Sequence, residues 1–276
     1  METYTSVLPG VRHHVHFRDV RIWSNALLVS KRIADVQAVI DAVRSHGLLD
    51  PEDFDTLQQT PVNVPIKGFP QTVDVPDVAT LRELLFENWL GERVLDAYGH
   101  LTMTTINTKK PNTILILPSI FHTQLTNAYR RSQLTTALKD LRESLLTSLP
   151  RFIAFVFNKD LSHWAPCVIS TAGRVVHQGD SLRWDPDKKL LAMLEWFLGD
   201  ITEVQGKWVD SYLDVPYQGS GSGSCGLVAF NAIQTFVDPD AKPWFDKQAS
   251  DWRLDWMGLI LKQHCTAVRC PTVVSL

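Results

Sequence analysis

The sequence predicts an α+β protein in which helices flank a β-sheet of mostly consecutive strands. Three observations support this fold class. After Pro150, three short segments rich in β-branched and aromatic residues follow one another, separated by polar or glycine-containing turns. Segments with helical apolar periodicity stand on both sides of them. Finally, 45% of the 276 residues are apolar, which is enough for a substantial core.

The N-terminal part begins with a weakly alternating stretch, from Thr3 to Val29. Alternation would place His14 and His16 on one face of a strand, where they would suit a metal pair, but ordinary surface histidines are the favoured interpretation. From Ser30 the apolar residues recur with a helical period. We expect an amphipathic helix that is capped by Ser30 and ends at Gly47.

Four prolines between Thr60 and Pro76 interrupt every regular pattern and predict a long surface loop. We place a boundary there, between an N-terminal extension of residues 1–75 and a main domain of residues 76–276. Asp77 then caps an expected helix over residues 78–90, which carries Trp89 near its end. Helical periodicity resumes at Val94.

The middle of the chain predicts a short strand at residues 114–117 and one or two helices over residues 124–149. These helices share an apolar stripe of Leu134, Leu138, Leu141 and Leu145. The strand candidates cover residues 151–157, 163–170 and 173–182. The remaining expected elements are a helix at 187–198, a strand at 207–213, and helices at 225–236 and 249–264.

One proline falls inside the second strand candidate. Pro166 cannot donate a ladder hydrogen bond, so we expect that strand to lie at a sheet edge or to be bulged. Cys167 alternates with Ala165 and Ile169, which indicates a buried thiol.

The charge pattern disfavours two classes of partner. Twenty-seven basic and thirty acidic residues give a net charge of −3, and no run of five like charges occurs. We therefore expect neither nucleic-acid binding nor a polybasic membrane surface. No window approaches the eighteen apolar residues that a membrane helix needs, and the N-terminus lacks the pattern of a secretory signal.

The four cysteines indicate a reducing compartment. Their number and spacing fit neither a disulfide scaffold nor a paired CxxC zinc site, so we expect an intracellular protein, nuclear or cytoplasmic, without a cofactor. His264, Cys265 and Cys270 also lack the spacing of a structural zinc site. Two packed thiols on a helix and its exit are the favoured interpretation, so we expect no metal.

The stretch from Val215 to Ala229 offers a nucleophile. Cys225 lies where a glycine/serine loop enters a helix, and the unpaired N–H groups and helix dipole there favour a thiolate. Gly226 would leave the backbone bare for a substrate carbonyl, and the Gln218 amide could donate to an oxyanion. The alternative is a flexible linker followed by a cysteine that only packs.

Two further residues could complete a catalytic set. A thiolate needs a base, and the base needs a third group to orient it. His163 opens one strand and Asp180 follows the next, so an antiparallel hairpin would bring them side by side. Taken singly, each suits an ordinary structural role. The order His, Asp, Gln, Cys, each at an element end, favours an enzyme.

These residues resemble the ubiquitin-like-protein-specific cysteine proteases, which include the SUMO proteases and, more distantly, the adenovirus protease. The family shows a WL motif on a helix, HW opening a strand, DSL after the next strand, and a Q before a loop into CG. The corresponding positions of this chain are Trp89-Leu90, His163-Trp164, Asp180-Ser181-Leu182, Gln218 and Cys225-Gly226. The resemblance covers roughly residues 77–270.

The resemblance implies a papain-like fold, with a central mixed, mostly antiparallel sheet flanked by helices and the nucleophile at a helix N-terminus. It implies Cys225 as nucleophile, His163 as general base and acid, Asp180 as the orienting acid and Gln218 as an oxyanion donor. Trp89 and Trp164 would then form the walls of a narrow tunnel for a Gly-Gly tail, beside Gly226.

The leading functional hypothesis is a thiol isopeptidase or endopeptidase that cleaves after the C-terminal Gly-Gly of a ubiquitin-like modifier. Its partners would be SUMO or a related modifier and the conjugates of that modifier. Alternatives are an acetyltransferase on the same fold and a catalytically weak binding module. Seven positions separate Gln218 from Cys225, one more than the commoner family spacing, so we expect weaker catalysis than in the family.

Overall fold

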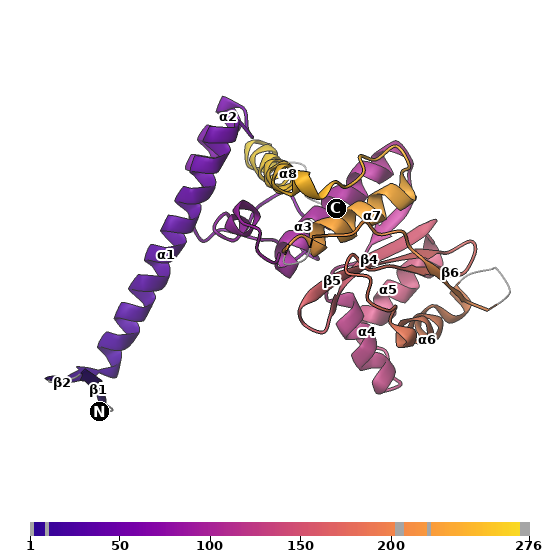
Figure 1. Cartoon of the computed structure of the whole chain (residues 1–276), viewed down its shortest axis with the longest axis horizontal. Helices are drawn as coiled ribbons and strands as arrows, with labels where there is room; N and C mark the ends of the chain where they lie inside the picture. Colours follow the sequence, from indigo (N-terminus) through magenta and orange to yellow (C-terminus); the bar gives the residue numbers. More distant parts are fainter. Residues whose placement is uncertain (1–2, 9–10, 202–206, 220–221, 271–276) are drawn as a thin grey trace.

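The computed structural model describes residues 3–8, 11–201, 207–219 and 222–270, without the side chains of residues 3–18 and 200. Figure 1 shows the arrangement of the elements. The helices are α1 (Phe17–His46), α2 (Pro51–Gln58), α3 (Glu92–Lys109), α4 (Phe121–Arg130), α5 (Thr136–Thr147), α6 (Lys188–Leu198), α7 (Cys225–Val237) and α8 (Ala249–Arg269). The strands are β1 (Thr3–Leu8), β2 (Val11–His16), β3 (Ile114–Ile116), β4 (Phe152–Lys159), β5 (His163–Ser170), β6 (Val175–Gln178) and β7 (Val209–Tyr212). Short 3-10 helices are η1 (Thr80–Leu85), η2 (Gly199–Ile201) and η3 (Asp246–Gln248).

A mixed sheet lies at the centre of the molecule, with the strand order β3-β4-β5-β6-β7 in the described part of the chain. The three inner strands run antiparallel, because β5 pairs with both β4 and β6 in that sense. The edge strands β3 and β7 run parallel to their neighbours. The α+β class and the consecutive inner strands are therefore confirmed.

Alternation along β4 and β5 gives the sheet two apolar faces. Phe155 and Cys167 point into a core formed with α4, α5 and α6, and Val156 and Trp164 point into a core formed with α3, α7 and α8. Successive strand side chains point to opposite faces, so helices must cover both. The resulting three layers place α7 against β5, which brings the start of α7 near the start of β5.

Helix α1 is longer than the sequence pattern predicts. It begins at Phe17 rather than at Ser30, because no glycine or proline interrupts residues 17–46 and Ser30 lies inside the helix. Its end is confirmed, since Gly47 has a φ of 61° and stops the helix. The strand-like alternation is confined to β1 and β2, which form a hairpin ahead of α1.

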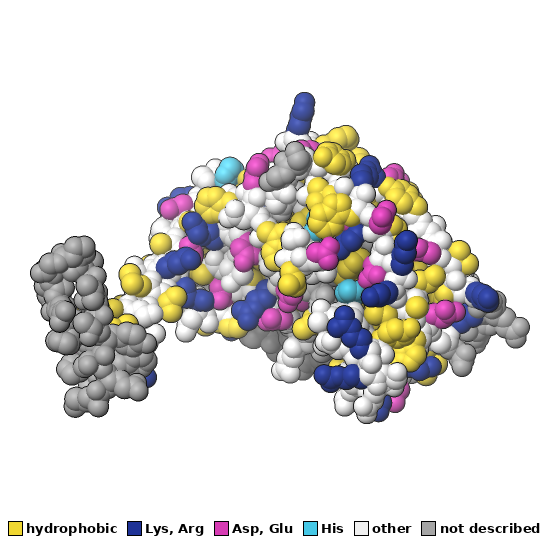
Figure 2. All heavy atoms as spheres, turned by 60° about the horizontal axis from the view of Figure 1, so that its bottom comes forward, with side chains coloured by type: hydrophobic (Ala, Val, Ile, Leu, Met, Phe, Trp, Pro, Cys, Tyr) yellow, Lys and Arg dark blue, Asp and Glu magenta, His cyan; other side chains and the backbone are white. Residues whose placement is uncertain are grey.

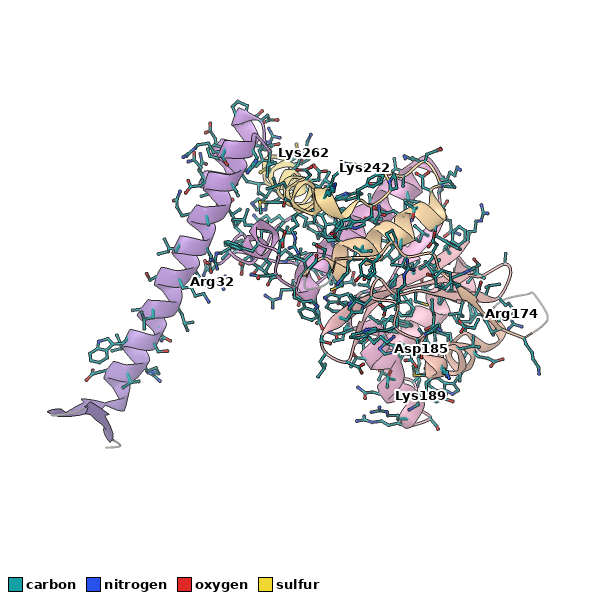
Figure 3. The ribbon with its side chains drawn as sticks, in the orientation of Figure 1. Arg32, Arg174, Asp185, Lys189, Lys242 and Lys262 are labelled. Carbon is teal, nitrogen blue, oxygen red and sulfur yellow. The ribbon has the colours of Figure 1, made fainter. Side chains whose placement is uncertain are left out.

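Only the C-terminal half of α1 packs on the body. Val39 and Val43 are buried in the core, whereas the N-terminal half projects away with large apolar side chains exposed, including Trp23 and Leu27. Arg32 forms an ion pair with Asp77 on the side of the helix that faces the body. Figure 3 labels Arg32 at this position.

The proline-rich segment is not a free surface loop as expected. Ile66 and Phe69 are buried in the core, and the Lys67 backbone N–H donates to Nδ1 of His264 on α8 at 2.9 Å. The segment packs against α8, where Gln263 Nε2 also donates to the Gly68 carbonyl at 2.6 Å. The same core contains Leu57 of α2, so apolar packing crosses residue 75, while the division of the chain there stays a prediction.

The helix expected over residues 78–90 is present only as the short 3-10 helix η1. Asp77 does cap it, because its Oδ1 accepts from the Thr80 backbone N–H at 2.9 Å. Only η1 is helical, however, and Trp89 lies in the connection between η1 and α3. Side chains bind the backbone there instead: Arg253 donates to the carbonyl of Asn88, and the Glu83 carboxylate accepts from the N–H of Gly91. These contacts replace the helical ladder.

The expectation for Pro166 is wrong for the strand as a whole, since β5 lies in the middle of the sheet, but it holds at the proline itself, where β5 has one neighbouring strand. The proline is tolerated because β6 pairs only with Cys167–Ser170, so at Pro166 strand β5 has a ladder partner only in β4.

The surface mixes charges and apolar groups. On the face that Figure 2 shows, acidic and basic side chains are interspersed with hydrophobic ones. None of the described helices combines the length and the apolar character that crossing a membrane requires.

Candidate active site

The pairing of β5 with β6 brings His163 and Asp180 together. His163 is the first residue of β5, and Asp180 lies two residues beyond the end of β6. Nε2 of His163 lies 3.0 Å from Oδ1 of Asp180, and both residues are buried. The expected hairpin geometry is therefore present, and Nδ1 of the imidazole is left for another partner.

The surroundings of His163 favour its protonated form. Burial alone would lower the pKa of the imidazole, but hydrogen bonds with Asp180 and Cys225 and the negative charge of both groups raise it to about 9. The Cys225 side chain is thus close enough to the ring to affect its charge. A cationic imidazole beside a thiol is the arrangement that stabilises a thiolate.

The Asp180 carboxylate is held in its charged form. Burial would raise the pKa of this carboxyl group. The hydrogen bond with His163 and the one from the Leu182 backbone N–H, at 2.8 Å, outweigh the effect of burial, so the pKa is lowered. Nζ of Lys159 lies 3.5 Å from Oδ2 and adds a positive charge. An ionised carboxylate at this position can orient the imidazole and stabilise the imidazolium.

Sequence reasoning missed two neighbours of this pair. Lys159 lies opposite His163 in the β4–β5 ladder, donates to the backbone carbonyl of Asp185 and sits over the Trp184 ring at 5.6 Å. Asp185, whose carbonyl accepts this hydrogen bond, is labelled in Figure 3. Trp184 in turn packs on His163, with 5.0 Å between ring centroids. The HW and DSL motifs gave no signal for either residue.

Cys225 is the first residue of α7, as predicted, and is 2% exposed. Its N–H and the next ones have no acceptor inside the helix, so they and the helix dipole favour negative charge at this point. Gly226 has a packing role that the sequence did not indicate: an added Cβ would lie 2.7 Å from Cδ2 of Leu95. The glycine lets α7 approach α3.

Gln218 is buried near the same end of the sheet. Its Oε1 accepts from the Ser181 hydroxyl at 3.0 Å, and its Nε2 donates to the Ser222 carbonyl at 3.2 Å. Ser181, directly after Asp180, thereby links this part of the chain to the glutamine. Since an amide nitrogen carries two hydrogens, the bond to Ser222 leaves one available for an oxyanion.

The two tryptophans of the expected tunnel lie together. Trp89 stacks on Trp164 with 5.0 Å between ring centroids and an interplanar angle of 12°. Trp164 is buried and its Nε1 donates to the Leu90 carbonyl at 2.9 Å, whereas 38% of Trp89 is exposed. A Cβ on Gly226 would lie 3.6 Å from Cδ1 of Trp164, so the tryptophan stack lies near the start of α7, which carries Cys225.

The other cysteine and histidine predictions have mixed outcomes. Cys167 and Cys265 are buried, as expected, but Cys270 is exposed rather than packed. His264 is buried and bonds to Lys67 and Thr60. No group of three or more potential metal ligands occurs among the described residues. The side chains of His14 and His16 lie outside the described ones.

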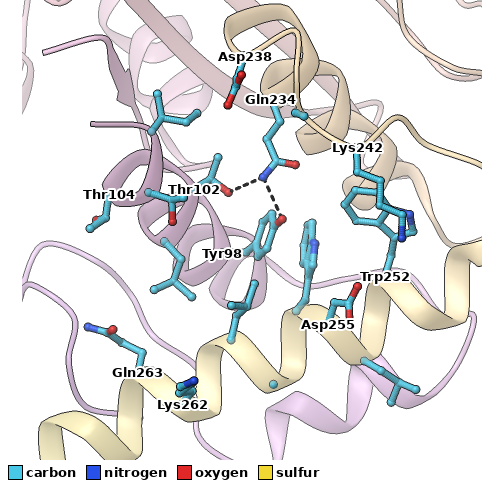
Figure 4. A pocket seen from close by; sticks show the side chains of 18 of the residues that line it. Tyr98, Thr102, Thr104, Gln234, Asp238, Lys242, Trp252, Asp255, Lys262 and Gln263 are labelled. Atoms are coloured by element: carbon cyan, nitrogen blue, oxygen red, sulfur yellow. Dashed lines mark hydrogen bonds between the residues drawn. The ribbon is translucent and has the colours of Figure 1, made fainter. Parts of the chain in front are cut away.

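A cavity of about 960 Å³ lies elsewhere, between α3, the C-terminal end of α7 and α8. Figure 4 shows Gln234 at this cavity, donating to the Tyr98 hydroxyl at 3.0 Å and to the Thr102 hydroxyl at 3.2 Å. His163, Asp180 and Cys225 do not line it. This cavity is thus separate from the candidate chemistry.

Comparison with known proteins yields structural matches alone. No model of a known protein family matches the sequence, and no curated protein matches it either. Among solved structures, the C-terminal Ulp1 protease domain in complex with Smt3, the yeast ortholog of SUMO, is similar at 21% identity and a TM-score of 0.59, over 79% of this chain and 97% of that one. A Ulp1-like SUMO protease catalytic domain from Chaetomium thermophilum is similar at 21% identity and a TM-score of 0.55. The match covers 78% of this chain and 90% of that one.

These matches span most of both chains, and the sheet and the helices correspond at a sequence identity near one fifth. The resemblance in the short motifs and the likeness in three dimensions agree. The chain therefore has the fold of the Ulp1-like SUMO proteases.

Proposed function

We propose that this protein is a thiol isopeptidase or endopeptidase that cleaves after the C-terminal Gly-Gly of a ubiquitin-like modifier. The observation that carries the proposal is the buried His163–Asp180 pair beside Cys225 at the start of α7. The solved structure of Ulp1 bound to Smt3 supports a ubiquitin-like partner, SUMO or a relative. Cleavage would mature a modifier precursor or release the modifier from lysine.

Each residue has a defined part in the proposed reaction. The Cys225 thiolate attacks the carbonyl carbon of the terminal glycine, and the α7 N–H groups and the Gln218 amide stabilise the oxyanion. His163 gives its proton to the leaving amine, which leaves a thioester on Cys225. The neutral imidazole then takes a proton from water as the water attacks the thioester, and the carboxylic acid product leaves with Cys225 regenerated.

The stacked tryptophans would supply substrate selection. In the proposed enzyme the modifier tail passes beside Trp89 and Trp164, where glycine, which has no side chain, fits and larger residues do not. We propose an intracellular site of action, nuclear or cytoplasmic, since a reactive thiol needs a reducing compartment and the four cysteines are free.

Hydrolysis of fluorogenic C-terminal amides of ubiquitin, SUMO and other ubiquitin-like proteins tests the proposal. Turnover of one of them that disappears in Cys225→Ala supports a protease of that modifier. Binding of a modifier without turnover would instead favour the binding module. Acetyl transfer from acetyl-CoA to a protein acceptor would favour the transferase.

A further inference from the structure

Arg253 of α8 lies between two loops that border the candidate site. The tryptophan loop is residues 86–91, and the nucleophile segment is residues 222–224. Arg253 is 2% exposed, and its Nη2 donates to the carbonyl of Asn88 at 2.8 Å and to that of Gly223 at 2.9 Å. One guanidinium group therefore holds the backbone of both loops.

The same side chain also reaches the end of η1. Nη1 of Arg253 donates to the Glu83 carbonyl at 3.1 Å, and the Glu83 carboxylate accepts from the Gly91 N–H at 2.8 Å. The tryptophan loop is thus fixed near its start and at its end. Trp89, which forms the exposed part of the tryptophan stack, lies within this fixed stretch.

The two loops also touch each other directly. The N–H of Gly223 donates to the Glu87 carbonyl at 3.2 Å. A Cβ at position 223 would lie 2.3 Å from that carbonyl oxygen and 2.5 Å from the carbonyl carbon of Asn88. Because backbone atoms cannot yield as a side-chain tip can, only glycine permits this approach.

We propose that Arg253 is a positioning residue that sets the separation between Trp89 and Cys225, and so the width of the entry to the thiol. Its planar group suits this task, because it presents several donors in a rigid fork to carbonyls from different directions. A lysine keeps the charge but cannot hold three carbonyls in this geometry. The identity of the substrate rests on the proposed function, whereas the positioning itself rests on the contacts alone.

The hydrogen bonds of Arg253 also fix part of the glycine-rich connection to Cys225. Gly223 lies two residues before Cys225 and is anchored from both α8 and the tryptophan loop. This anchor fixes the end of the connection that enters α7, whatever the length between Gln218 and Gly223. The extra residue there therefore affects the position of Gln218 more than that of the thiol.

Alkylation of Cys225 by reagents of different size tests this positioning role of Arg253. Iodoacetamide and a bulky naphthyl maleimide react with the whole chain, and mass spectrometry of peptides separates Cys225 from the exposed Cys270. We expect the ratio of bulky to small reagent rates at Cys225 to rise about tenfold in Arg253→Lys and in Gly223→Ala, because displaced loops open the entry. Gly258→Ala is the matched control on α8, since its Cβ would have no neighbour closer than 3.6 Å.

An unchanged ratio in folded Arg253→Lys would overturn the proposal. If circular dichroism shows that this variant does not fold, the ratio in Gly223→Ala decides instead, and a wild-type value there overturns it. The alkylation ratio needs no substrate. If no modifier amide is hydrolysed by the wild-type protein, the proposed function fails. The positioning role of Arg253 is still tested by the ratio of the two alkylation rates.

Discussion

At the scale of single residues, the charge state of the catalytic candidates follows from what surrounds them. His163 and Asp180 lie in contact and out of water, so each stabilises the charged form of the other. The raised pKa of His163, about 9, keeps the imidazole protonated at neutral pH. The protonated imidazole and the α7 N-terminus both place positive charge beside the Cys225 side chain.

The alkaline limit of activity tests this pairing. Loss of the imidazolium proton removes the acid for the leaving amine, so kcat/KM of the wild type should fall as the pH rises through about 9. Asp180→Asn removes the carboxylate that raises the pKa of His163, and the limit should move to lower pH, toward the ordinary value of 6.5.

Asp185→Asn is the control for the loss of a nearby negative charge, because Asp185 contacts Lys159 through its backbone carbonyl and not through its carboxylate. Its pH profile of kcat/KM should match that of the wild type. A profile of Asp180→Asn with the wild-type alkaline limit would show that Asp180 does not govern the protonation of His163.

Trp89 provides a second residue-scale prediction. Trp89→Ala removes the exposed member of the stack with Trp164, so hydrolysis of a modifier amide should fall at least tenfold in kcat/KM. The loss of stability should be smaller than for a fully buried tryptophan, because Trp89 is 38% exposed. Trp23→Ala, on the projecting part of α1 where 60% of the indole is exposed, is the matched control and should keep full activity.

At the scale of elements, the site depends on the turn that leads from β6 to Asp180. Gly179 precedes Asp180, and a Cβ there would lie 2.3 Å from the Leu213 carbonyl oxygen. Leu213 follows β7 and its N–H donates to the Gln178 carbonyl at 2.8 Å. The close approach of these two backbones therefore fixes where the carboxylate points.

Gly179→Ala should push the turn away from Leu213 and displace Asp180 from His163. We expect at least a tenfold loss of kcat/KM and a loss of about 1 to 3 kcal/mol in the free energy of unfolding, measured by urea denaturation. Gly173→Ala, in the turn at the other end of β6, meets only a side-chain methyl at 3.3 Å and should leave activity intact. Equal activity of the two variants would contradict the account of this turn.

At the scale of the whole molecule, α1, α2 and the proline-rich segment share a core with the helices that carry Cys225 and Arg253. Leu57 of α2 is 1% exposed and belongs to the same apolar cluster as Met257 of α8. The projecting half of α1 makes no such contribution, since its large apolar side chains are exposed. Stability should therefore depend on one part of the first 75 residues and not on the other.

Leu57→Ala should lower the free energy of unfolding by about 2 to 5 kcal/mol, because it leaves a cavity in a shared core. Leu27→Ala, at a position that is 71% exposed, should change it by less than about 0.5 kcal/mol. Urea titration followed by far-ultraviolet circular dichroism measures both. A separate early transition in Leu57→Ala, with the midpoint of the main transition unchanged, would support the division at residue 75 as a true domain boundary.

Patterns that involve only neighbours in sequence predicted much of this molecule. Alternation and turns identified β4, β5 and β6, and the antiparallel hairpin that follows from them brought His163 to Asp180. The loop-to-helix change identified the start of α7 at Cys225. These features depend on local periodicity and chain direction, which a sequence displays.

What the sequence did not reveal depends on contacts between distant segments. The tryptophan loop is not helical because Arg253, 165 residues after Asn88, binds its carbonyl. Lys159 and Trp184 reach His163 and Asp180 only after β4 and the turn beyond Asp180 have come together. Gly226 and Gly223 lack side chains because of what packs against them from elsewhere in the chain. No local pattern encodes such partners.

The most direct test of the central claim uses ubiquitin-like proteins whose C-terminal glycine carries an electrophile that traps a thiolate. Mixing the wild-type protein with a panel of such probes should give one covalent adduct, located on Cys225 by mass spectrometry and abolished in Cys225→Ala. The identity of the reacting probe names the modifier. Absence of an adduct with every probe, in protein whose Cys225 still reacts with iodoacetamide, would contradict the assignment as a ubiquitin-like-protein protease.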